Sequence, residues 1–467
     1  MSSSANDNQH NGLRFVSANE NVKISGVKLM LSGGQTRSYS KVPYKFQFPE
    51  GRPLLDIDVL KLRSAETDPT MIREKLYIDI LNSLGAPVPQ ASYVRVFFNQ
   101  KPVGLYIAEE IMKEHWVKAV LHSGHINKTG SLWKMDADDG FRADLQFKGT
   151  KADAYEYGHI YKRLMPGSNP KKEPMHDLIN FIADIKNFDP ATEKDPQGYW
   201  AKRLDLDLFL KCMAMEYLAG YWDGYWTSGS NYQMYNDPAT KVWTWLPVDY
   251  DDTFGSSYPH DLGPYRQFPQ KSQSTLVHKL ILQSPQINAR FEVILKEIVA
   301  YVFKPQALLP RVTAYKNMIF DDVKWDRSLP RLNKGDSEEF TIQDLTKGVA
   351  EGKKDDLGLK GWIEQRTAGV EKDLKFKVLA GTPSKVQPHV VTKLQSAYGI
   401  PDQAEKSTAK EEGTPKDAVA KTEETKGNSD ITGTTPVQAE KSANSATSLK
   451  SAWSAFVATV ALVILAL

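Results

Sequence analysis

The composition of the chain changes sharply near residue 380, and this change limits what can fold. Residues 381–451 are rich in Lys, Glu, Thr, Ser, Ala and Pro and hold few large apolar side chains. Such a segment cannot bury enough apolar surface to offset the entropy that ordering would cost. We therefore predict a disordered stalk at 381–451, a disordered N-terminus at 1–13, and a globular domain at 14–380.

The last residues, 452–467, are almost all apolar. As a helix they would span about 24 Å, less than a hydrocarbon core of about 30 Å. Small polar residues precede them, a pattern typical of a glycosylphosphatidylinositol (GPI) attachment signal with Asn444 or Ser442 as the attachment residue. A tail-anchored membrane helix is the alternative. Both interpretations predict a protein held at a membrane, although the start, MSSSAND, does not have the pattern of a secretory signal.

Charge and cysteine content exclude several classes of function. The net charge of +2 gives no indication of a nucleic-acid partner. The one cysteine, Cys212, cannot form a disulfide within the chain, and its apolar surroundings predict a buried core residue. The histidines show no metal-ligand spacing, so we expect no structural zinc site.

The spacing of apolar residues predicts a mixed α+β domain. Strands are expected first, around one helix at 69–84, and the remainder is expected to be mostly helical. The predicted strands lie at 22–31, 44–48, 91–98 and 103–111, with a later hairpin at 231–236 and 242–247. The predicted helices after the first lie near 174–188, 206–221, 275–282, 286–303, 306–320 and 360–377.

Two acid-rich segments near the middle of the chain carry the most chemistry. Asp223 directly follows the apolar helix predicted at 206–221, and Asn231 comes eight residues later. The C-terminal end of a helix carries partial negative charge, so a carboxylate there does not stabilise the helix. This favours a functional role for Asp223. The alternative is a loop residue that forms turn hydrogen bonds.

The second segment follows the predicted hairpin and contains Asp249 and Asp251. On an extended strand, residues two apart point to the same face, so both carboxylates can address one metal–phosphate site. The alternative is a solvated acidic turn. Neighbouring aromatic residues favour a buried hairpin, where acids need a partner such as a metal ion.

The chain resembles the spore-coat protein H (CotH-type) family of atypical kinase-like proteins, and within it the fungal surface-anchored branch. The resemblance runs from about residue 22 to 255, with weaker helical likeness to about 379. It rests on GGQTRSYSKVPYK at 33–45, DPTMIREKL at 68–76, GAPVP at 85–89, GLY at 104–106, WDGYW at 222–226 and PVDYDDTFG at 247–255. It implies a two-lobed kinase-like fold, with a β-rich small lobe at about 14–112 and a mostly helical large lobe at about 113–380.

The resemblance also implies ATP and Mg²⁺ as cofactors and assigns roles to residues. Asp223 would be the catalytic carboxylate, and Asn231, Asp249 and Asp251 the metal ligands. Gly33, Gly34, Arg37, Lys41 and Lys45 would contact the nucleotide, with Glu74 or Glu110 orienting a lysine. The sequence does not choose between these two glutamates.

Two functions are consistent with these features. The first is a kinase that phosphorylates Ser or Thr of secreted or surface proteins. The second is a surface-anchored adhesin whose kinase-like head binds a host or cell-wall receptor with little or no catalysis. The set of acidic residues favours the first, while the stalk and the apolar tail allow the second.

Overall fold

The computed structural model describes residues 12–18, 20–167, 174–256, 262–269, 274–350, 357–385 and 461–466. Most of the predicted stalk, the residues before position 12, and the predicted attachment residues Ser442 and Asn444 lie outside the described residues. The first strand begins at Gly12. Gly12 and Leu13 therefore belong to a strand, although we predicted that residues 1–13 are disordered.

Eight strands form the larger sheet, in the order β2-β1-β12-β6-β7-β5-β4-β3. All neighbouring pairs are antiparallel except β12 and β6. The strands are β1 (Gly12–Val16), β2 (Asn21–Ser25), β3 (Lys28–Leu31), β4 (Tyr44–Gln47), β5 (Val59–Arg63), β6 (Ala91–Phe98), β7 (Lys101–Glu110) and β12 (Ala461–Ala466).

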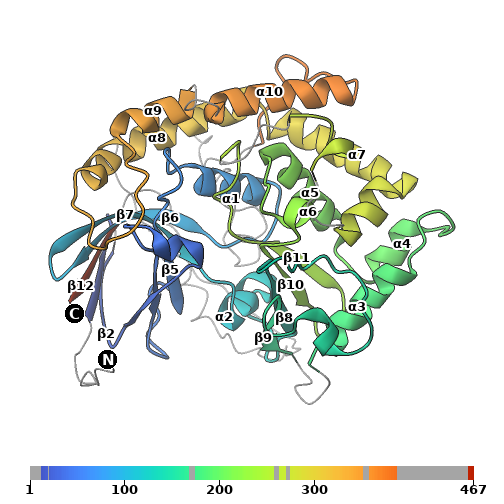
Figure 1. The fold of residues 1–467 in the computed structure, drawn as a ribbon, viewed down its shortest axis with the longest axis horizontal. Helices are drawn as coiled ribbons and strands as arrows, with labels where there is room; N and C mark the ends of the chain where they lie inside the picture. Colours follow the sequence, from blue (N-terminus) through green and yellow to red (C-terminus); the bar gives the residue numbers. More distant parts are fainter. Residues whose placement is uncertain are drawn as a thin grey trace, which may run out of the picture.

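The β12 strand brings the end of the chain into this sheet. It lies between β1 and β6, with Leu465 opposite Leu13 and Val463 opposite Val96. Both termini of the described chain therefore lie at the same side of the molecule (Figure 1). Among the described residues, no helix combines the length and apolar character needed to cross a bilayer.

A second, antiparallel sheet has the order β11-β10-β8-β9. Its strands are β8 (Ser131–Met135), β9 (Tyr161–Pro166), β10 (Tyr232–Asn236) and β11 (Trp243–Pro247). The pairing of β10 with β11 confirms the hairpin predicted from the sequence.

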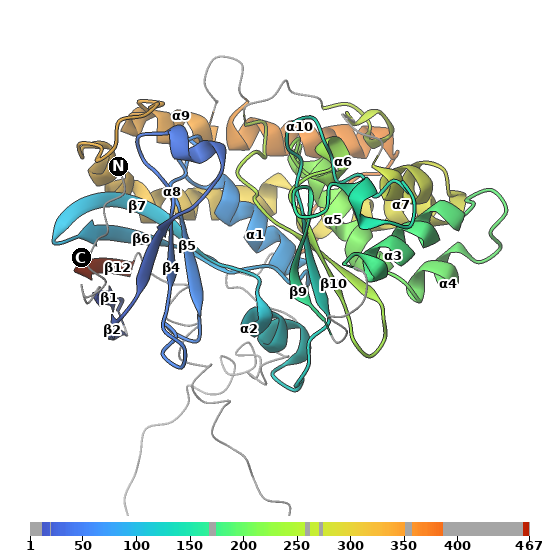
Figure 2. The same ribbon diagram turned by 60° about the horizontal axis from the view of Figure 1, so that its bottom comes forward.

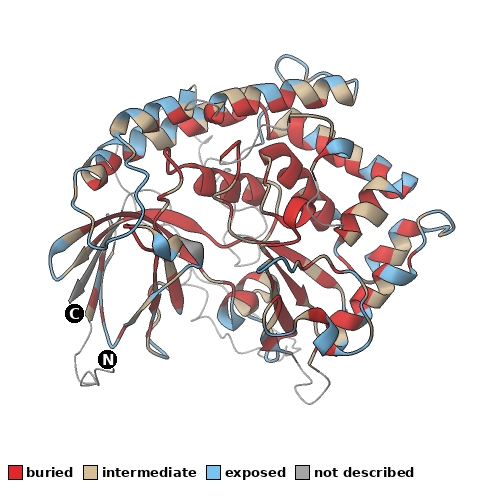
Figure 3. Ribbon diagram, viewed as in Figure 1, coloured by how far each residue is buried: buried red, intermediate tan, exposed pale blue. Residues whose placement is uncertain are grey.

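The helices surround these two sheets. They are α1 (Arg73–Ser83), α2 (Glu114–Trp116), α3 (His176–Asn187), α4 (Pro196–Ala201), α5 (Leu206–Ala219), α6 (Tyr225–Ser228), α7 (Pro285–Tyr301), α8 (Pro305–Arg327), α9 (Ile342–Ala350) and α10 (Gly358–Asp373). Figure 2 shows α1 between the larger and the smaller sheet, with α8 running behind it. Figure 3 shows that α1 and α5 are buried along almost their whole length, whereas the outer faces of α8, α9 and α10 are exposed.

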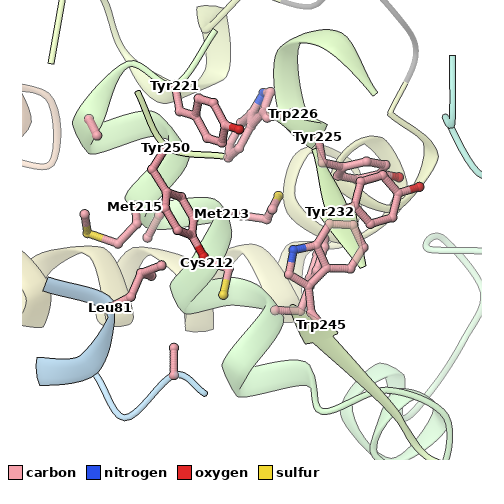
Figure 4. Packing of buried hydrophobic residues seen from close by; sticks show 14 of the residues in the cluster. Leu81, Cys212, Met213, Met215, Tyr221, Tyr225, Trp226, Tyr232, Trp245 and Tyr250 are labelled. Atoms are coloured by element: carbon pink, nitrogen blue, oxygen red, sulfur yellow. The ribbon is translucent and has the colours of Figure 1, made fainter. Parts of the chain in front are cut away.

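Helix α5 forms the centre of the core, as its apolar sequence predicted. Its first turn is capped by Asp205, whose side chain accepts a hydrogen bond from the backbone N–H of Leu208 at 3.1 Å. Cys212 is 1% exposed and packs among methionine and aromatic side chains (Figure 4). The prediction of a buried, structural cysteine is therefore confirmed.

Strands β1, β5, β8, β9 and β12 were not predicted from the sequence, and β5 matters most for the site. The β5 strand, Val59–Arg63, is buried on both faces except at Lys61. It therefore lacks the polar–apolar alternation that identifies a half-buried strand. The predicted strand at 22–31 is also divided into β2 and β3, because Gly26 between them has a positive φ of +79°.

Candidate active site

Asp223 lies in the turn that follows α5. The helix ends at Gly220, whose φ of +61° is left-handed, a conformation that glycine adopts without strain. Asn231 Nδ2 donates a hydrogen bond to the Asp223 carboxylate at 2.6 Å and another to the Asp223 backbone oxygen at 3.1 Å. The two polar residues of the first acid-rich segment are therefore in direct contact.

A buried carboxyl group supports this turn. Glu216 on α5 is 1% exposed and accepts a hydrogen bond from the backbone N–H of Trp226 at 2.7 Å. Burial raises the pKa of Glu216 to about 8, although backbone N–H donors counteract the shift. A Cβ atom at Gly224 would lie 2.7 Å from Glu216 Oε2, so only glycine fits there. The sequence alone did not reveal Glu216, because one glutamate in an apolar helix carries no signal for a loop beyond the helix end.

Asp249 and Asp251 follow β11 in a loop, and not in an extended strand as we expected. Asp249 has a left-handed φ of +68°, which breaks the strand direction. The hydroxyl group of Tyr221 donates to the backbone oxygen of Asp249 at 2.5 Å. This contact joins the two acid-rich segments, because Tyr221 lies two residues before Asp223.

One guanidinium group holds three carboxylates together. Arg63 at the end of β5 has a side chain that is 9% exposed, and it contacts Asp249 through Nη1 and Asp251 through Nη2, the latter at 3.0 Å. Its Nε lies 2.7 Å from Oε2 of Glu74 on α1. Oxygen atoms of Glu74, Asp249 and Asp251 all lie within 4.8 Å of one another. Arg63 therefore supplies the positive charge that these clustered acids need.

The pKa shifts indicate that four carboxyl groups converge here. Burial opposes ionisation of Asp249, but Arg63 outweighs burial and holds the pKa of Asp249 below its usual range. Asp252 behaves in the opposite way. Burial, reinforced by the charges of Asp251, Asp223 and Asp249, raises the pKa of Asp252 to about 8. Asp252 therefore holds its proton more tightly than an ordinary aspartate, and a cation bound nearby would favour release of that proton.

The oxygen atoms of this cluster suit a hard divalent cation. Mg²⁺ prefers carboxylate and amide oxygens. Glu74, Asp249 and Asp251 offer carboxylate oxygens within 4.8 Å of one another, whereas the side chain of Asn231 contacts Asp223. Within the described part of the chain, Oε1 of Glu74 is buried and has no hydrogen-bond partner, so it is free to act as a ligand. The side chain of Asp249 is 41% exposed, which leaves the cluster open to solvent. The residues present therefore fit Mg²⁺.

The glycine turn lies between β3 and β4 of the larger sheet. Gly33 has a φ of +80°, and a Cβ atom there would lie 2.1 Å from a threonine hydroxyl oxygen, so the turn requires glycine. The Nε atom of Arg37 donates to the backbone oxygen of Ser32 at 3.2 Å, which closes the turn. Burial, together with the charges of Glu338 and Asp336 and a smaller contribution from Asp252, raises the pKa of Tyr39, which follows the turn.

Strand register places Lys45 on the face of the sheet that carries Arg63. Lys45 lies opposite Lys61, and Lys61 lies opposite Glu109. Residues paired across strands share a face, as do residues two apart along one strand. Lys61 and Arg63 both help to lower the pKa of Asp249. The basic row that faces the acids is therefore Lys45, Lys61 and Arg63.

Lys41, which we expected to contact the nucleotide, pairs with an acid outside this cluster. Its Nζ lies 3.0 Å from Oδ1 of Asp326 on α8, and both side chains are almost fully buried. Lys41 follows the short helical turn after Gly34 and precedes β4, so strand periodicity does not decide its direction.

The structure distinguishes the two glutamates that the sequence left open. Glu110 lies opposite Leu60 on β5. Successive residues of a strand point to opposite faces, so Leu60 and Glu110 lie on the face that does not carry Lys61 and Arg63. It accepts a hydrogen bond from the backbone N–H of Gln90 at 3.1 Å, and burial raises its pKa to about 8. Glu74 is therefore the glutamate that contacts the cluster.

Comparison with known proteins supports the resemblance seen in the sequence. The family profile described as CotH kinase protein matches residues 29–368. Invasin CotH3 of Rhizopus delemar is 28% identical over 393 residues, covering 80% of this chain and 64% of the relative. Inner spore coat protein H of Bacillus subtilis is 22% identical over 321 residues, covering 68% of this chain and 83% of the relative. The chain thus spans a little under two thirds of the length of Rhizopus relatives such as invasins CotH3 and CotH2.

Among solved structures, a complex of HipA, HipB and operator DNA from Shewanella oneidensis aligns with 80% of this chain and 66% of its own chain, at 11% identity and a TM-score of 0.24. The family profile, in contrast, covers most of the globular domain, including the Arg63–Glu74 pair and all four converging aspartates. The chain therefore belongs to the CotH kinase protein family.

Proposed function

We propose that this protein is an atypical protein kinase that depends on ATP and Mg²⁺. The observation that carries the proposal is the contact of Arg63 with Glu74, Asp249 and Asp251. In protein kinases, a basic strand residue pairs with a glutamate of a neighbouring helix, and an aspartate further along the chain binds Mg²⁺. The order β5, α1, α5, β10 and β11 in this chain is consistent with that arrangement. A small lobe at about 14–112 and a large lobe at about 113–380 are part of the same proposal.

In this proposal, each residue has one role. Asp223 accepts the proton of the acceptor hydroxyl while the hydroxyl oxygen bonds to the γ-phosphorus and the bond to ADP breaks. Asn231, Asp249 and Asp251 would hold Mg²⁺, which neutralises phosphate charge when bound. Glu74 orients Arg63, and the nucleotide phosphates are contacted by Gly33, Gly34, Arg37 and Lys45.

Nucleotide binding tests this proposal directly. We expect the melting temperature of the purified protein to rise by several degrees across millimolar ATP with MgCl₂, because a ligand at 100 times its Kd stabilises the folded state by about 2.7 kcal/mol. MgCl₂ alone and ATP with excess EDTA are the controls. A melting temperature that does not respond to ATP with MgCl₂ would contradict the proposal.

The proposed substrates are Ser and Thr residues of secreted or surface proteins, and the Ser- and Thr-containing stalk of this chain is itself a candidate. Three R. delemar relatives are named invasins, which supports a position at the cell surface and keeps receptor binding as a second candidate function. We propose that residues 452–467 tether the protein to the membrane, which requires β12 to leave its place between β1 and β6 in the larger sheet.

Removing residues 442–467 tests the tether. We expect the truncated protein to move from the cell-bound fraction into the medium, as measured by immunoblotting of both fractions. This truncation also deletes β12. Phe456→Asp is therefore the matched variant, since it interrupts the apolar run outside β12. Retention of both variants at the surface would rule out the tether.

A further inference from the structure

Helix α1, which carries Glu74, is buried on all sides although it is rich in charged residues. Ten of its eleven residues are buried, including Arg73, Glu74, Lys75 and Asp79. A buried charge is stable only with a partner. The partners of these residues therefore determine where α1 can lie.

The partners of Asp79 come mainly from α8. Arg311 Nη1 lies 3.0 Å from Asp79 Oδ2, and the hydroxyl group of Tyr315 donates to the same oxygen. Lys75 Nζ lies 2.6 Å from the other carboxylate oxygen, Asp79 Oδ1. The side chains of Lys75, Asp79 and Arg311 are all at most 10% exposed. Moving α1 away from α8 would leave the Asp79 charge without most of its partners.

The other end of α8 is fixed to the larger sheet. Asp326 Oδ1 lies 3.0 Å from Lys41 Nζ and accepts a hydrogen bond from the backbone N–H of Leu105 on β7 at 2.8 Å. A Cβ atom at Gly104 would lie 2.3 Å from the same oxygen, so the sheet and the helix meet closely. Helix α8 therefore contacts α1 with its first half and the sheet with its second half.

The turn before α1 is fixed as well. Asp68 is 3% exposed and accepts hydrogen bonds from the backbone N–H groups of Thr70 at 2.8 Å and Arg73 at 3.0 Å. The Nη2 atom of Arg327, the last residue of α8, donates to the backbone oxygen of Pro69 at 2.5 Å. Both the start and the middle of α1 are thus held by buried polar contacts.

We propose that α8 is a fixed brace that holds α1 in one position, and that Asp79, Arg311 and Tyr315 are positioning residues for the Glu74–Arg63 pair. Glu74 and Asp79 lie on the same helix, so a displacement that separates Asp79 from α8 also moves Glu74. Where kinases are regulated by moving the corresponding helix, the strand–helix ion pair forms only in the active state. Here buried charges hold the helix, so the pair forms without an activating signal. The consequence for catalysis rests on the proposed function, but the brace itself does not.

The test compares Arg311→Met with Arg311→Lys and with the milder Tyr315→Phe. Arg290→Met is the control, because Arg290 pairs with Asp207 at 2.5 Å in an exposed ion pair outside the brace. Hydrogen exchange without nucleotide reports on α1, with the amides of α5 as the internal reference. We expect exchange in α1 to become at least tenfold faster in Arg311→Met, to change in the same direction but less in Tyr315→Phe, and to be partly restored in Arg311→Lys.

The affinity for ATP with MgCl₂ then tests whether α8 positions the Glu74–Arg63 pair. We expect this affinity to fall about tenfold in Arg311→Met and to be unchanged in Arg290→Met. Unchanged α1 exchange in both Arg311→Met and Tyr315→Phe would overturn the brace. Faster α1 exchange with wild-type nucleotide affinity would overturn the positioning role. If wild-type protein binds no nucleotide, the proposed function and the positioning role fail together, while the exchange data still decide whether α8 holds α1.

Discussion

Replacing Asp223 with asparagine is expected to lower the rate of phosphoryl transfer by about 100- to 10,000-fold while leaving nucleotide binding nearly unchanged. The reason is that asparagine keeps the shape of the side chain but cannot accept the proton of the acceptor hydroxyl. The contact with Asn231, 2.6 Å in the wild-type protein, can persist through the amide oxygen. The turn should therefore keep its conformation.

Transfer of labelled phosphate from ATP to a Ser- and Thr-containing protein substrate measures the rate, and the nucleotide-induced rise in melting temperature measures binding. Asp139→Asn is a suitable control, because Asp139 is an exposed aspartate. A variant Asp223→Asn that retains more than a tenth of wild-type transfer would exclude Asp223 as the catalytic base. Loss of nucleotide binding together with transfer would instead indicate a structural role for Asp223.

Replacing Arg63 with methionine is expected to destabilise the fold strongly in the absence of divalent cations. Removal of one partner from a buried ion pair typically costs about 3–5 kcal/mol, because the remaining charge stays buried. Here the cost comes mainly from Glu74, whose side chain is 3% exposed, because the side chains of Asp251 and Asp249 are 22% and 41% exposed and water screens their charges. We also expect MgCl₂ to stabilise Arg63→Met more than it stabilises the wild-type protein, because Mg²⁺ would replace part of the lost positive charge.

Denaturant unfolding with and without MgCl₂ measures both effects. Arg63→Lys should be intermediate, because an ammonium group keeps the charge but lacks the planar fork that reaches several carboxylates. Equal stability of Arg63→Met and the wild-type protein would show that the cluster does not depend on this residue. Destabilisation without any added response to MgCl₂ would show that the carboxylates are held by Arg63 but do not bind the metal ion.

Local features of the sequence were sufficient for much of the fold. The apolar spacing of residues 206–221 predicted α5, and the β-rich runs around Asp237 and Pro238 predicted the β10–β11 hairpin. The order of Asp223, Asn231, Asp249 and Asp251 was visible for the same reason, since each lies close to the end of a predictable element. Helix periodicity, strand alternation and turn chemistry act over a few residues, so one sequence contains enough information to identify them.

The positions of the acidic residues, and the helix and hairpin beside them, follow from local sequence patterns. The basic residue that contacts these acids is set by long-range packing. Arg63 and Asp249 are 186 positions apart in the chain, and nothing local to β5 indicates this contact. The same is true of Lys41, which pairs with Asp326 on α8. A buried charge is stable only beside its partner, and the packing of sheets and helices, rather than spacing along the chain, determines which partner is close enough.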